Sequence, residues 1–279
     1  MIRVIADTTS TLTVKDAKEM GIYLLPQIII FGEKEYRDDT EISSEEFLKK
    51  LKESSSLPHT AAPSPALYSP IYEEIIANGD IVLVLTPSAK VSGTFRSATV
   101  AAKDFPSDRI IIIDTEIIGP AFAYVIRQTL EKIKTGASLD EITNWISNKC
   151  KTLVIYFYVD TLEYLQKGGR IGMAKALMGS VLQIKPILLF KDGQVNPFES
   201  QRTKKRAMAR ISELVKQGCP NSVENNLSIF QSDAMEDALA FKEDFKDFSG
   251  TSEISITNLP PAIVVHAGPG VVAVSFFTQ

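Results

Sequence analysis

Short apolar runs alternate with amphipathic segments through the first half of the chain. Runs of strand length predict strands at residues 2–6, 23–31, 80–86 and 109–114. Apolar residues at helical spacing predict helices at residues 14–20, 43–52, 63–79, 94–103, 120–134 and 139–149. Strands that alternate with helices in this way favour a mostly parallel sheet covered by helices on both faces.

The second half has a different order of elements. Strands are expected at residues 152–158, 227–231, 253–257, 262–266 and 271–277, and Asp192-Gly193 predicts a hairpin between residues 186–190 and 194–200. Helices are expected at residues 161–167, 172–182, 204–217 and 235–245. This order favours an α+β unit with an antiparallel or mixed sheet. We therefore expect an α/β protein of two domains, residues 1–150 and 151–279.

Composition and charge narrow the class of partner. Hydrophobic residues make up 44% of the chain and the mean hydropathy is +0.04, a surplus that a larger core or an apolar cavity would absorb. The net charge is −4, and the densest basic segment is Arg202–Arg206 on a predicted helix. Duplex binding needs a larger cationic surface. This segment is therefore interpreted as a solvated helix face or a protein-docking patch, and nucleic acid is disfavoured.

The chain has the features of a protein of the reducing cytoplasm. Its two cysteines, Cys150 and Cys219, are too few for a disulfide framework and lack metal-type spacing. The N-terminus begins directly as a strand, without the pattern of a signal peptide. No apolar run approaches the ~18 residues of a membrane span. A cytoplasmic location is expected, and a transient contact with a membrane stays open.

Three loops of the first half leave predicted strands with hydroxyl-rich sequences. They are Asp7-Thr8-Thr9-Ser10, Thr86-Pro87-Ser88, and Asp114-Thr115, and the second continues as Ser92-Gly93-Thr94 into a helix. Ligands of open parallel sheets bind beyond the carboxyl ends of the strands. A helix N-terminus favours an anion, and glycine at 93 would let the backbone approach it closely. Plain helix capping by Ser92 or Thr94 is the alternative.

His266 is one of only two histidines in the chain. It ends the predicted apolar strand at residues 262–266 and is followed by Ala267-Gly268-Pro269-Gly270. A satisfied core histidine is one interpretation. The sharp turn that follows favours the other, in which the ring faces a crevice and has a function.

The sequence lacks the motifs of several enzyme classes. We find no phosphate-binding G-x-x-x-x-G-K-[ST] loop, no His/Cys/carboxylate metal cluster and no G-x-S-x-G elbow. Nothing therefore predicts an ATP site, a metal or another cofactor. A hydrolase or transferase that uses Ser92 with His266 as its base stays open as an alternative.

Six segments of the chain form an ordered set: Asp7-Thr8-Thr9-Ser10, Thr60-Ala61-Ala62-Pro63-Ser64, residues 91–98 around Ser92-Gly93-Thr94, residues 160–171 with Gly168-Gly169-Arg170, Lys185-Pro186 and His266-Ala267-Gly268-Pro269-Gly270. Taken together, these segments resemble the DegV family, and the similarity covers essentially the whole chain. Each segment alone is weak, whereas six in the right order are specific.

The resemblance implies a fatty-acid-binding protein. Members bind a long-chain fatty acid, such as palmitate or oleate, in a tunnel between two α/β domains. Some serve as the binding subunit of a fatty-acid kinase whose separate subunit uses ATP. It implies carboxylate contacts from Thr60, Ser92 and His266, with Arg170, Gly93 and Thr94 in support. Arg202 and Lys205 would then dock the kinase subunit. A lipid sensor without a kinase partner is a further possibility.

The chain departs from the family pattern at two positions. Ala61 stands where the family often has serine, which would remove a hydroxyl near the head group. Thr11 stands where an acidic residue is usual, and this change is expected to affect a helix start rather than the ligand.

Overall fold

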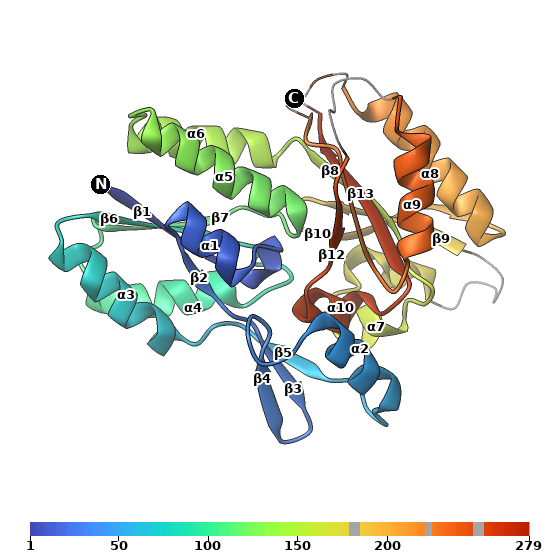
Figure 1. Ribbon diagram of the computed structural model, residues 1–279, viewed down its shortest axis with the longest axis horizontal. Coiled ribbons are helices and arrows are strands. Elements are labelled where there is room, and N and C mark those ends of the chain that lie inside the picture. The colour runs from blue at the N-terminus through green and yellow to red at the C-terminus, as the bar shows by residue number, and fades with distance from the viewer. Residues whose placement is uncertain (179–184, 221, 223–224, 248–253, 279) are drawn as a thin grey trace.

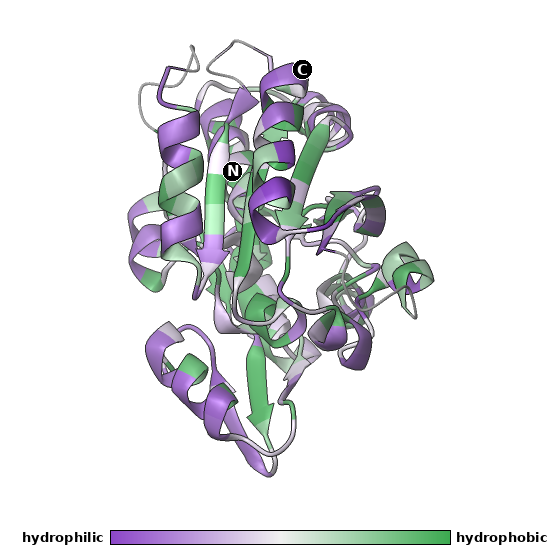
Figure 2. Ribbon diagram, turned by 90° about the vertical axis from the view of Figure 1, so that its right-hand side faces the viewer, coloured by the Kyte–Doolittle hydropathy of each residue, from purple (hydrophilic) through white to green (hydrophobic). Residues whose placement is uncertain are grey.

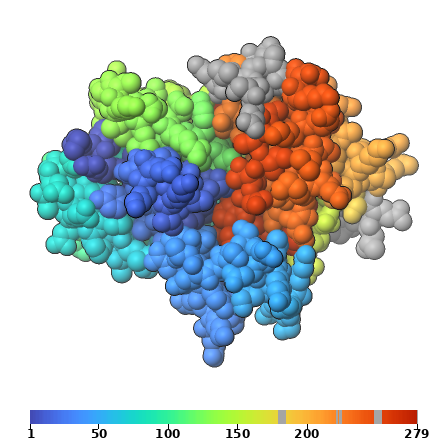
Figure 3. All heavy atoms as spheres, in the orientation of Figure 1, coloured from blue at the N-terminus to red at the C-terminus, as the bar shows by residue number. Residues whose placement is uncertain are grey.

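The computed structural model describes residues 1–178, 185–220, 222, 225–247 and 254–278. The expected α/β class is confirmed: a parallel four-stranded sheet, a mixed six-stranded sheet and a small three-stranded sheet are present. All strands of the parallel and three-stranded sheets precede residue 115, and all strands of the six-stranded sheet follow residue 152. One hydrophobic cluster includes residues of both halves, and the two halves lie against each other (Figure 3). The domain division at residue 150 stays a prediction.

The parallel sheet has the strand order β2-β1-β6-β7. Its strands are β1 (Ile2–Asp7), β2 (Tyr23–Leu25), β6 (Ile81–Thr86) and β7 (Ile110–Asp114). Side chains alternate between its faces. Ile5 and Val84 pack with α3 (Pro65–Ala77) and α4 (Thr94–Ala101), while Val4 and Leu85 share a cluster with residues of α5 (Pro120–Lys134) and α6 (Leu139–Cys150). Helices therefore cover both faces, as the near-continuous apolar runs predict (Figure 1).

The six-stranded sheet has the order β10-β9-β8-β13-β11-β12, antiparallel except for the β11–β12 pair. Its strands are β8 (Leu153–Tyr158), β9 (Lys185–Lys191), β10 (Gln194–Gln201), β11 (Ser228–Ser232), β12 (Ile256–Asn258) and β13 (Val271–Phe277). Val272 and Val274 pack against α8 (Lys204–Gly218) and α9 (Met235–Asp244). The opposite face, with Phe157 and Ala273, belongs to the cluster shared by both halves. The central strands are accordingly apolar (Figure 2).

The strand predicted at residues 23–31 is two strands in different sheets. β2 ends at Leu25, Pro26 follows, and β3 (Ile28–Phe31) then pairs with β4 (Lys34–Arg37) and β5 (His59–Ala61). Proline lacks the N–H that a continuous ladder needs, so the chain leaves one sheet and enters another there. The sequence analysis missed β4 and β5. Together with α2 (Ser44–Glu53), this small sheet projects below the rest of the molecule (Figure 1).

The strand predicted at residues 262–266 is wrong. This segment forms α10 (Pro261–Ala267), with Pro260 as its N-cap residue and Gly268 after its end at a φ of 78°. Proline suits the first turn of a helix and glycine suits the position after the last turn. These end signals outweigh the β-branched residues inside, because a short apolar run alone does not distinguish a strand from a buried helix.

Two smaller differences also concern the second half. The helix predicted at residues 172–182 is a 3₁₀ helix, η3 (Gly172–Leu177), and residues 179–184 lie outside the described part. The strand predicted at residues 253–257 is β12, shifted to Ile256–Asn258, and residue 253 lies outside the described part. The remaining elements are α1 (Val14–Met20), α7 (Glu163–Lys167) and the 3₁₀ turns η1 (Thr8–Ser10) and η2 (Ala102–Asp104).

Candidate functional site

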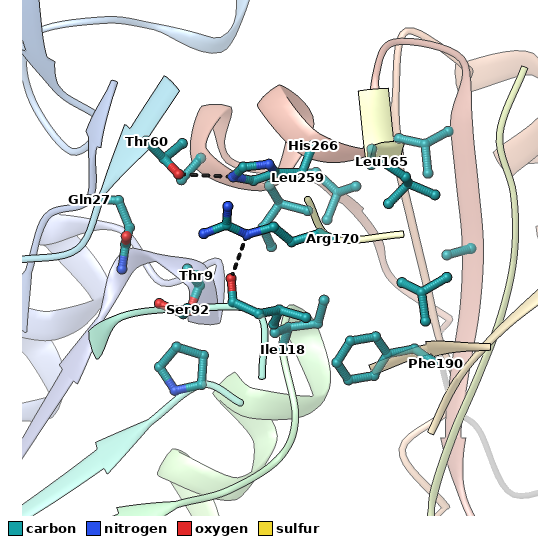
Figure 4. Close-up of a pocket in the computed structure, with 18 of the residues that line it drawn as sticks. Thr9, Gln27, Thr60, Ser92, Ile118, Leu165, Arg170, Phe190, Leu259 and His266 are labelled. Atoms are coloured by element: carbon teal, nitrogen blue, oxygen red, sulfur yellow. Dashed lines mark hydrogen bonds between the residues drawn. The ribbon is translucent and has the colours of Figure 1, made fainter. Parts of the chain in front are cut away.

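A largely apolar cavity lies between the two halves of the chain, and its empty volume is about 910 Å³ including the part open to solvent. Its apolar wall comes from the six-stranded sheet: Ile155 and Phe157 on β8, Phe190 on β9, Phe230 on β11 and Ala273 on β13. In Figure 4, Phe190 and Leu165 lie on one side, and Gln27, Thr60 and Ser92 lie on the other. Mainly apolar walls with a few convergent polar side chains are typical of a site for a small organic ligand. The site is therefore an apolar cavity with one polar end.

Thr60, Ser92 and His266 all line this cavity. Thr60 lies on β5, Ser92 in the loop before α4, and His266 on α10. The Oγ1 atom of Thr60 is 2.9 Å from Nε2 of His266. The structure therefore brings together the three residues expected to bind a carboxylate, although they are far apart in the sequence.

The environment of His266 determines which ring nitrogen carries the proton. Nδ1 is buried without a hydrogen-bond partner among the described residues, and it lies next to the Cα of Gly168. Burial and the nearby charge of Arg170 lower the pKa of His266 to about 3, so the ring is neutral. A buried N–H without a partner is costly, so we place the proton on Nε2, which donates to Thr60. The Thr60 hydroxyl is then free to donate into the cavity.

Arg170 and Gly93 also line the cavity. The Nε atom of Arg170 donates to the Val91 carbonyl at 3.0 Å (Figure 4). Its Nη1 donates to the Gly168 carbonyl at 2.7 Å. Arg170 therefore ties the loop of Ser92 to the end of α7. A Cβ at Gly93 would lie 3.3 Å from the Cβ of Ala62, so glycine there lets the loops of Ser92 and Thr60 approach closely.

The loop that carries Ser92 is also held by the β9–β10 turn. The buried Ser88 hydroxyl donates to the carbonyl of Gly193 at 2.6 Å, and Lys90 Nζ donates to the carbonyl of Asp192 at 2.6 Å. A side chain at Gly193 would meet Ser88 Oγ at 2.5 Å. The predicted Asp192-Gly193 hairpin therefore has a second role, which is to fix the loop at the polar end of the cavity.

A fully buried carboxylate, Asp7, lies behind Ser92. Its Oδ2 accepts hydrogen bonds from Thr94 Oγ1 at 2.6 Å and from Gln27 Nε2 at 2.7 Å, and its Oδ1 accepts from the backbone N–H and hydroxyl of Thr9. Thr94 Oγ1 is in turn 3.0 Å from Ser92 Oγ. Burial raises the pKa of Asp7, and the hydrogen bonds oppose that rise. Thr94 thus supports Ser92, while the sequence analysis missed Gln27.

Asp38 is a second buried carboxylate beside this network. It accepts hydrogen bonds from the Thr8 hydroxyl at 2.7 Å and from the backbone N–H of Gln27 at 2.9 Å. Burial, together with the charge of Asp7, raises its pKa to about 7, although the Thr8 hydrogen bond opposes the rise. Asp38 also follows β4, which the sequence analysis did not predict.

The raised pKa of Asp38 predicts a pH-dependent stability. The folded chain holds this proton more tightly than the unfolded chain, whose aspartate has a pKa near 3.8. The favourable contribution is therefore present at low pH and is lost as pH rises from about 4 through 7, on the order of 2 kcal/mol between pH 5 and pH 8. Asp38→Asn should remove this loss. In urea unfolding, the free energy of unfolding of the variant minus that of wild type should be larger at pH 8 than at pH 5. An equal difference at both pH values would contradict the raised pKa of Asp38.

The segment Arg202–Arg206 lies at the junction of β10 and α8. Arg202, Lys205 and Arg206 are exposed, whereas Lys204 pairs with Asp237 at 2.7 Å. Cations in the first turn of a helix oppose its dipole, so their placement does not serve the stability of α8. The exposed side chains form a basic patch, and its proposed docking role is taken up below.

Ala61 and Thr11, the two departures from the family pattern, lie away from the cavity lining. Thr60 and Ala62 line the cavity, but Ala61 between them on β5 is exposed. Thr11 ends η1 with a φ of 67°, where its backbone N–H bonds to the Thr8 carbonyl. The expected loss of a head-group hydroxyl at Ala61 is therefore not supported. Thr11 lies at the C-terminal end of η1 and not at a helix start, because α1 begins at Val14 with Thr13 as its N-cap.

Within the described residues, no group of three or more His, Cys, Asp or Glu side chains has the geometry to hold a metal ion. In the same part of the chain, no helix is both long and apolar enough to cross a membrane.

The whole chain, residues 1–279, matches the family described as uncharacterised proteins of the DegV family. A DegV domain-containing protein of Halalkalibacterium halodurans is 30% identical and covers 100% of this chain and 99% of its own. A structure described as fatty-acid binding of a DegV family protein from Thermus thermophilus has a TM-score of 0.92 at 28% identity, covering 100% and 99% of the two chains. DegV of Bacillus subtilis, described as a fatty acid binding protein, has a TM-score of 0.87 at 29% identity over 99% of each chain. This chain therefore belongs to the DegV family, as its six ordered sequence segments predict.

Proposed function

We propose that this protein binds one long-chain fatty acid, with the acyl chain in the apolar cavity and the carboxylate at Thr60, Ser92 and His266. The observation that carries the proposal is the cavity itself, whose walls are mainly apolar and whose one polar end holds these three side chains. The fatty-acid-binding relatives from Thermus thermophilus and Bacillus subtilis support it.

The acyl chain and the head group of the ligand contribute differently to the free energy of binding. Burying each methylene contributes about 0.8 kcal/mol, so a 16-carbon chain gains on the order of 10 kcal/mol before ordering costs. The hydroxyls of Thr60 and Ser92 then select an oxygen-bearing head group and set its position. Affinity therefore comes from the acyl chain and orientation from the polar end.

Thr60→Val should weaken fatty-acid binding by about tenfold while the fold is retained. Valine matches the shape of threonine but cannot accept from His266 Nε2 or donate to a carboxylate, a loss of about 1–2 kcal/mol. Displacement of a fluorescent fatty acid by palmitate measures the effect. Thr99→Val, on the exposed face of α4, is the matched control and should bind like wild type. An unchanged affinity in Thr60→Val would exclude this side chain from the head-group site.

The proposal extends to the presentation of the carboxylate to a separate kinase subunit that makes the acyl phosphate. The sequence lacks a phosphate-binding loop, so the nucleotide would have to come from another chain. The exposed basic patch of Arg202 and Lys205 is the proposed docking surface for that subunit. A lipid sensor without a kinase partner would share the cavity and not need the patch.

Reversing the charge at Arg202 tests this extension. Arg202→Glu should reduce capture of a purified ATP-binding fatty-acid kinase subunit by at least tenfold, because a basic patch would dock against acidic groups and glutamate would repel them. Palmitate binding should be unchanged. Lys15→Glu on α1, also an exposed cation, is the control. Capture that is absent already in wild type would favour the sensor.

An autonomous hydrolase is less well supported by the geometry. Its base, His266, would have to accept the Ser92 proton, but Nε2 of His266 faces Thr60 at 2.9 Å and Ser92 faces Thr94 at 3.0 Å. The described residues provide no carboxylate partner for Nδ1 of His266. We therefore propose a lipid-binding protein rather than an enzyme acting alone.

We propose a cytoplasmic location as well. Cys150 and Cys219 are both free thiols, and burial raises the pKa of each to about 12. Thiols held in this protonated form are poorly reactive. They suit a reducing compartment, where no disulfide is needed to support the fold.

A further inference from the structure

The hydrogen bonds behind Ser92 form a chain with a fixed direction. Thr94 has one hydroxyl proton, and its 2.6 Å contact with Asp7 Oδ2 commits that proton to the carboxylate. Thr94 Oγ1 therefore acts as an acceptor toward Ser92 Oγ, 3.0 Å away. Ser92 must then donate its own proton to Thr94. Ser92 Oγ also accepts from the backbone N–H of Thr94, so in this state it offers one lone pair to the cavity and no proton.

An ionised fatty-acid head group is an acceptor only, so it cannot pair with Ser92 in that state. Binding would also add a second negative charge close to Asp7, which is fully buried and has no ion-pair partner among the described residues. Two carboxylates that share a buried site disfavour double ionisation and retain one proton between them. One added proton removes both problems.

We propose that Asp7 is a positioning residue for the head group, and that binding takes up one proton, shared between the head group and Asp7 through Ser92 and Thr94. In one form, the acid O–H donates to Ser92, Ser92 to Thr94, and Thr94 to ionised Asp7. In the other form, protonated Asp7 donates to Thr94, Thr94 to Ser92, and Ser92 to the carboxylate. Every hydroxyl is both donor and acceptor in each form. This inference rests on the proposed function.

The surrounding charges agree with a single proton. Asp38, after β4, and Tyr68, on α3, face Asp7, and the like charge of Asp38 opposes ionisation of Asp7. At the cavity end, Arg170 contributes one positive charge and His266 is neutral. One positive charge balances one carboxylate of the pair, and the proton neutralises the other. Burial raises the pKa of Asp7, which also favours the retention of a proton at this end of the cavity.

Isothermal titration calorimetry with decanoate, a fatty acid short enough to stay dissolved, tests the inference. At pH 7.5, free decanoate is ionised, so titrations in phosphate and in Tris report the protons that binding takes up. Wild type should take up about one proton per decanoate, and its affinity should fall about tenfold per pH unit above neutrality. Binding by wild type without proton uptake would overturn the inference and leave the proposed function intact. Failure to bind decanoate and palmitate would overturn the proposed function itself.

Variants test whether the proton is held by the hydrogen bonds that link Ser92, Thr94 and Asp7. The Thr9 N–H fixes the oxygen of an Asn at Oδ1, so Asp7→Asn would place its amide N–H toward Thr94 and make Ser92 a donor. The Gln27 side-chain amide, which donates to Asp7 Oδ2 in wild type, would turn to present its oxygen to the new amide. This variant should bind decanoate with no proton uptake, and Thr94→Val should also lose the uptake. Thr94→Ser and the neighbouring Asp38→Asn should keep it. Uptake that persists in both Asp7→Asn and Thr94→Val would place the proton elsewhere and overturn the inference.

Discussion

Ala273→Phe should abolish high-affinity binding of a long-chain fatty acid while the protein stays folded. Ala273 is 1% exposed and lies on β13 directly between Phe157 on β8 and Phe230 on β11, and all three line the cavity. The small side chain leaves room between two phenylalanines. A phenyl ring there would displace about four methylenes of the ligand, or about 3 kcal/mol, which is more than 100-fold in affinity.

The opposite face of the same strand provides the control. Val274 packs with α8 and α9, away from the cavity. Val274→Ala should lower the free energy of unfolding by about 2 kcal/mol and leave palmitate binding unchanged. Ala273→Phe should lose palmitate binding and keep the free energy of unfolding of wild type, because the ring fills space that already exists in the cavity. Palmitate binding within threefold of wild type in Ala273→Phe would mean that the acyl chain lies elsewhere.

Gly168→Ala should weaken fatty-acid binding by about 100-fold without touching the ligand. Gly168 has ordinary backbone angles, with φ of −75°, so the effect comes from space alone. A Cβ there would lie 2.3 Å from Nδ1 of His266 and 2.9 Å from the Tyr164 carbonyl oxygen. The ring would have to move and lose its hydrogen bond to Thr60, which disturbs two head-group contacts, about 3 kcal/mol in total. Palmitate displacement and the NMR shifts of the His266 ring measure the change.

The adjacent glycine separates crowding from backbone strain. Gly169 has a φ of 70° and an added Cβ would meet nothing within 4 Å. Gly169→Ala should cost about 1 kcal/mol of stability through strain, with palmitate affinity unchanged. If Gly168→Ala bound palmitate as Gly169→Ala does, the position of the His266 ring would not matter for the head group.

The fold was largely predictable where pattern and end signals agree. The alternation of apolar runs with amphipathic segments is enough to predict β1, β6 and β7 and the helices between them. Asp192-Gly193 marks the β9–β10 hairpin. The failures have local causes. Pro26 divides one apolar run between two sheets, and Pro260-Pro261 converts the apolar run before His266 into a helix. In both places proline was the signal, and its effect depends on neighbours that the sequence pattern does not reveal.

Several residues that line the cavity could be predicted from the sequence, whereas the hydrogen bonds between them could not. Hydroxyl-rich loops and a histidine before a glycine-proline turn indicated Ser92 and His266, and family resemblance added Thr60. That His266 bonds Thr60 rather than Ser92 follows from β5 and α10, neither of which was predicted. Gln27 lies between strands and its side chain reaches Asp7 only in the folded chain. Contacts between segments this far apart carry no signal in a single sequence.

Native mass spectrometry of the purified protein, followed by organic extraction and lipid analysis, tests the central claim most directly. The account predicts one fatty acid per chain, long enough to occupy the apolar cavity, and its release on denaturation. A protein that is purified empty and also fails to take up added palmitate or oleate would contradict it.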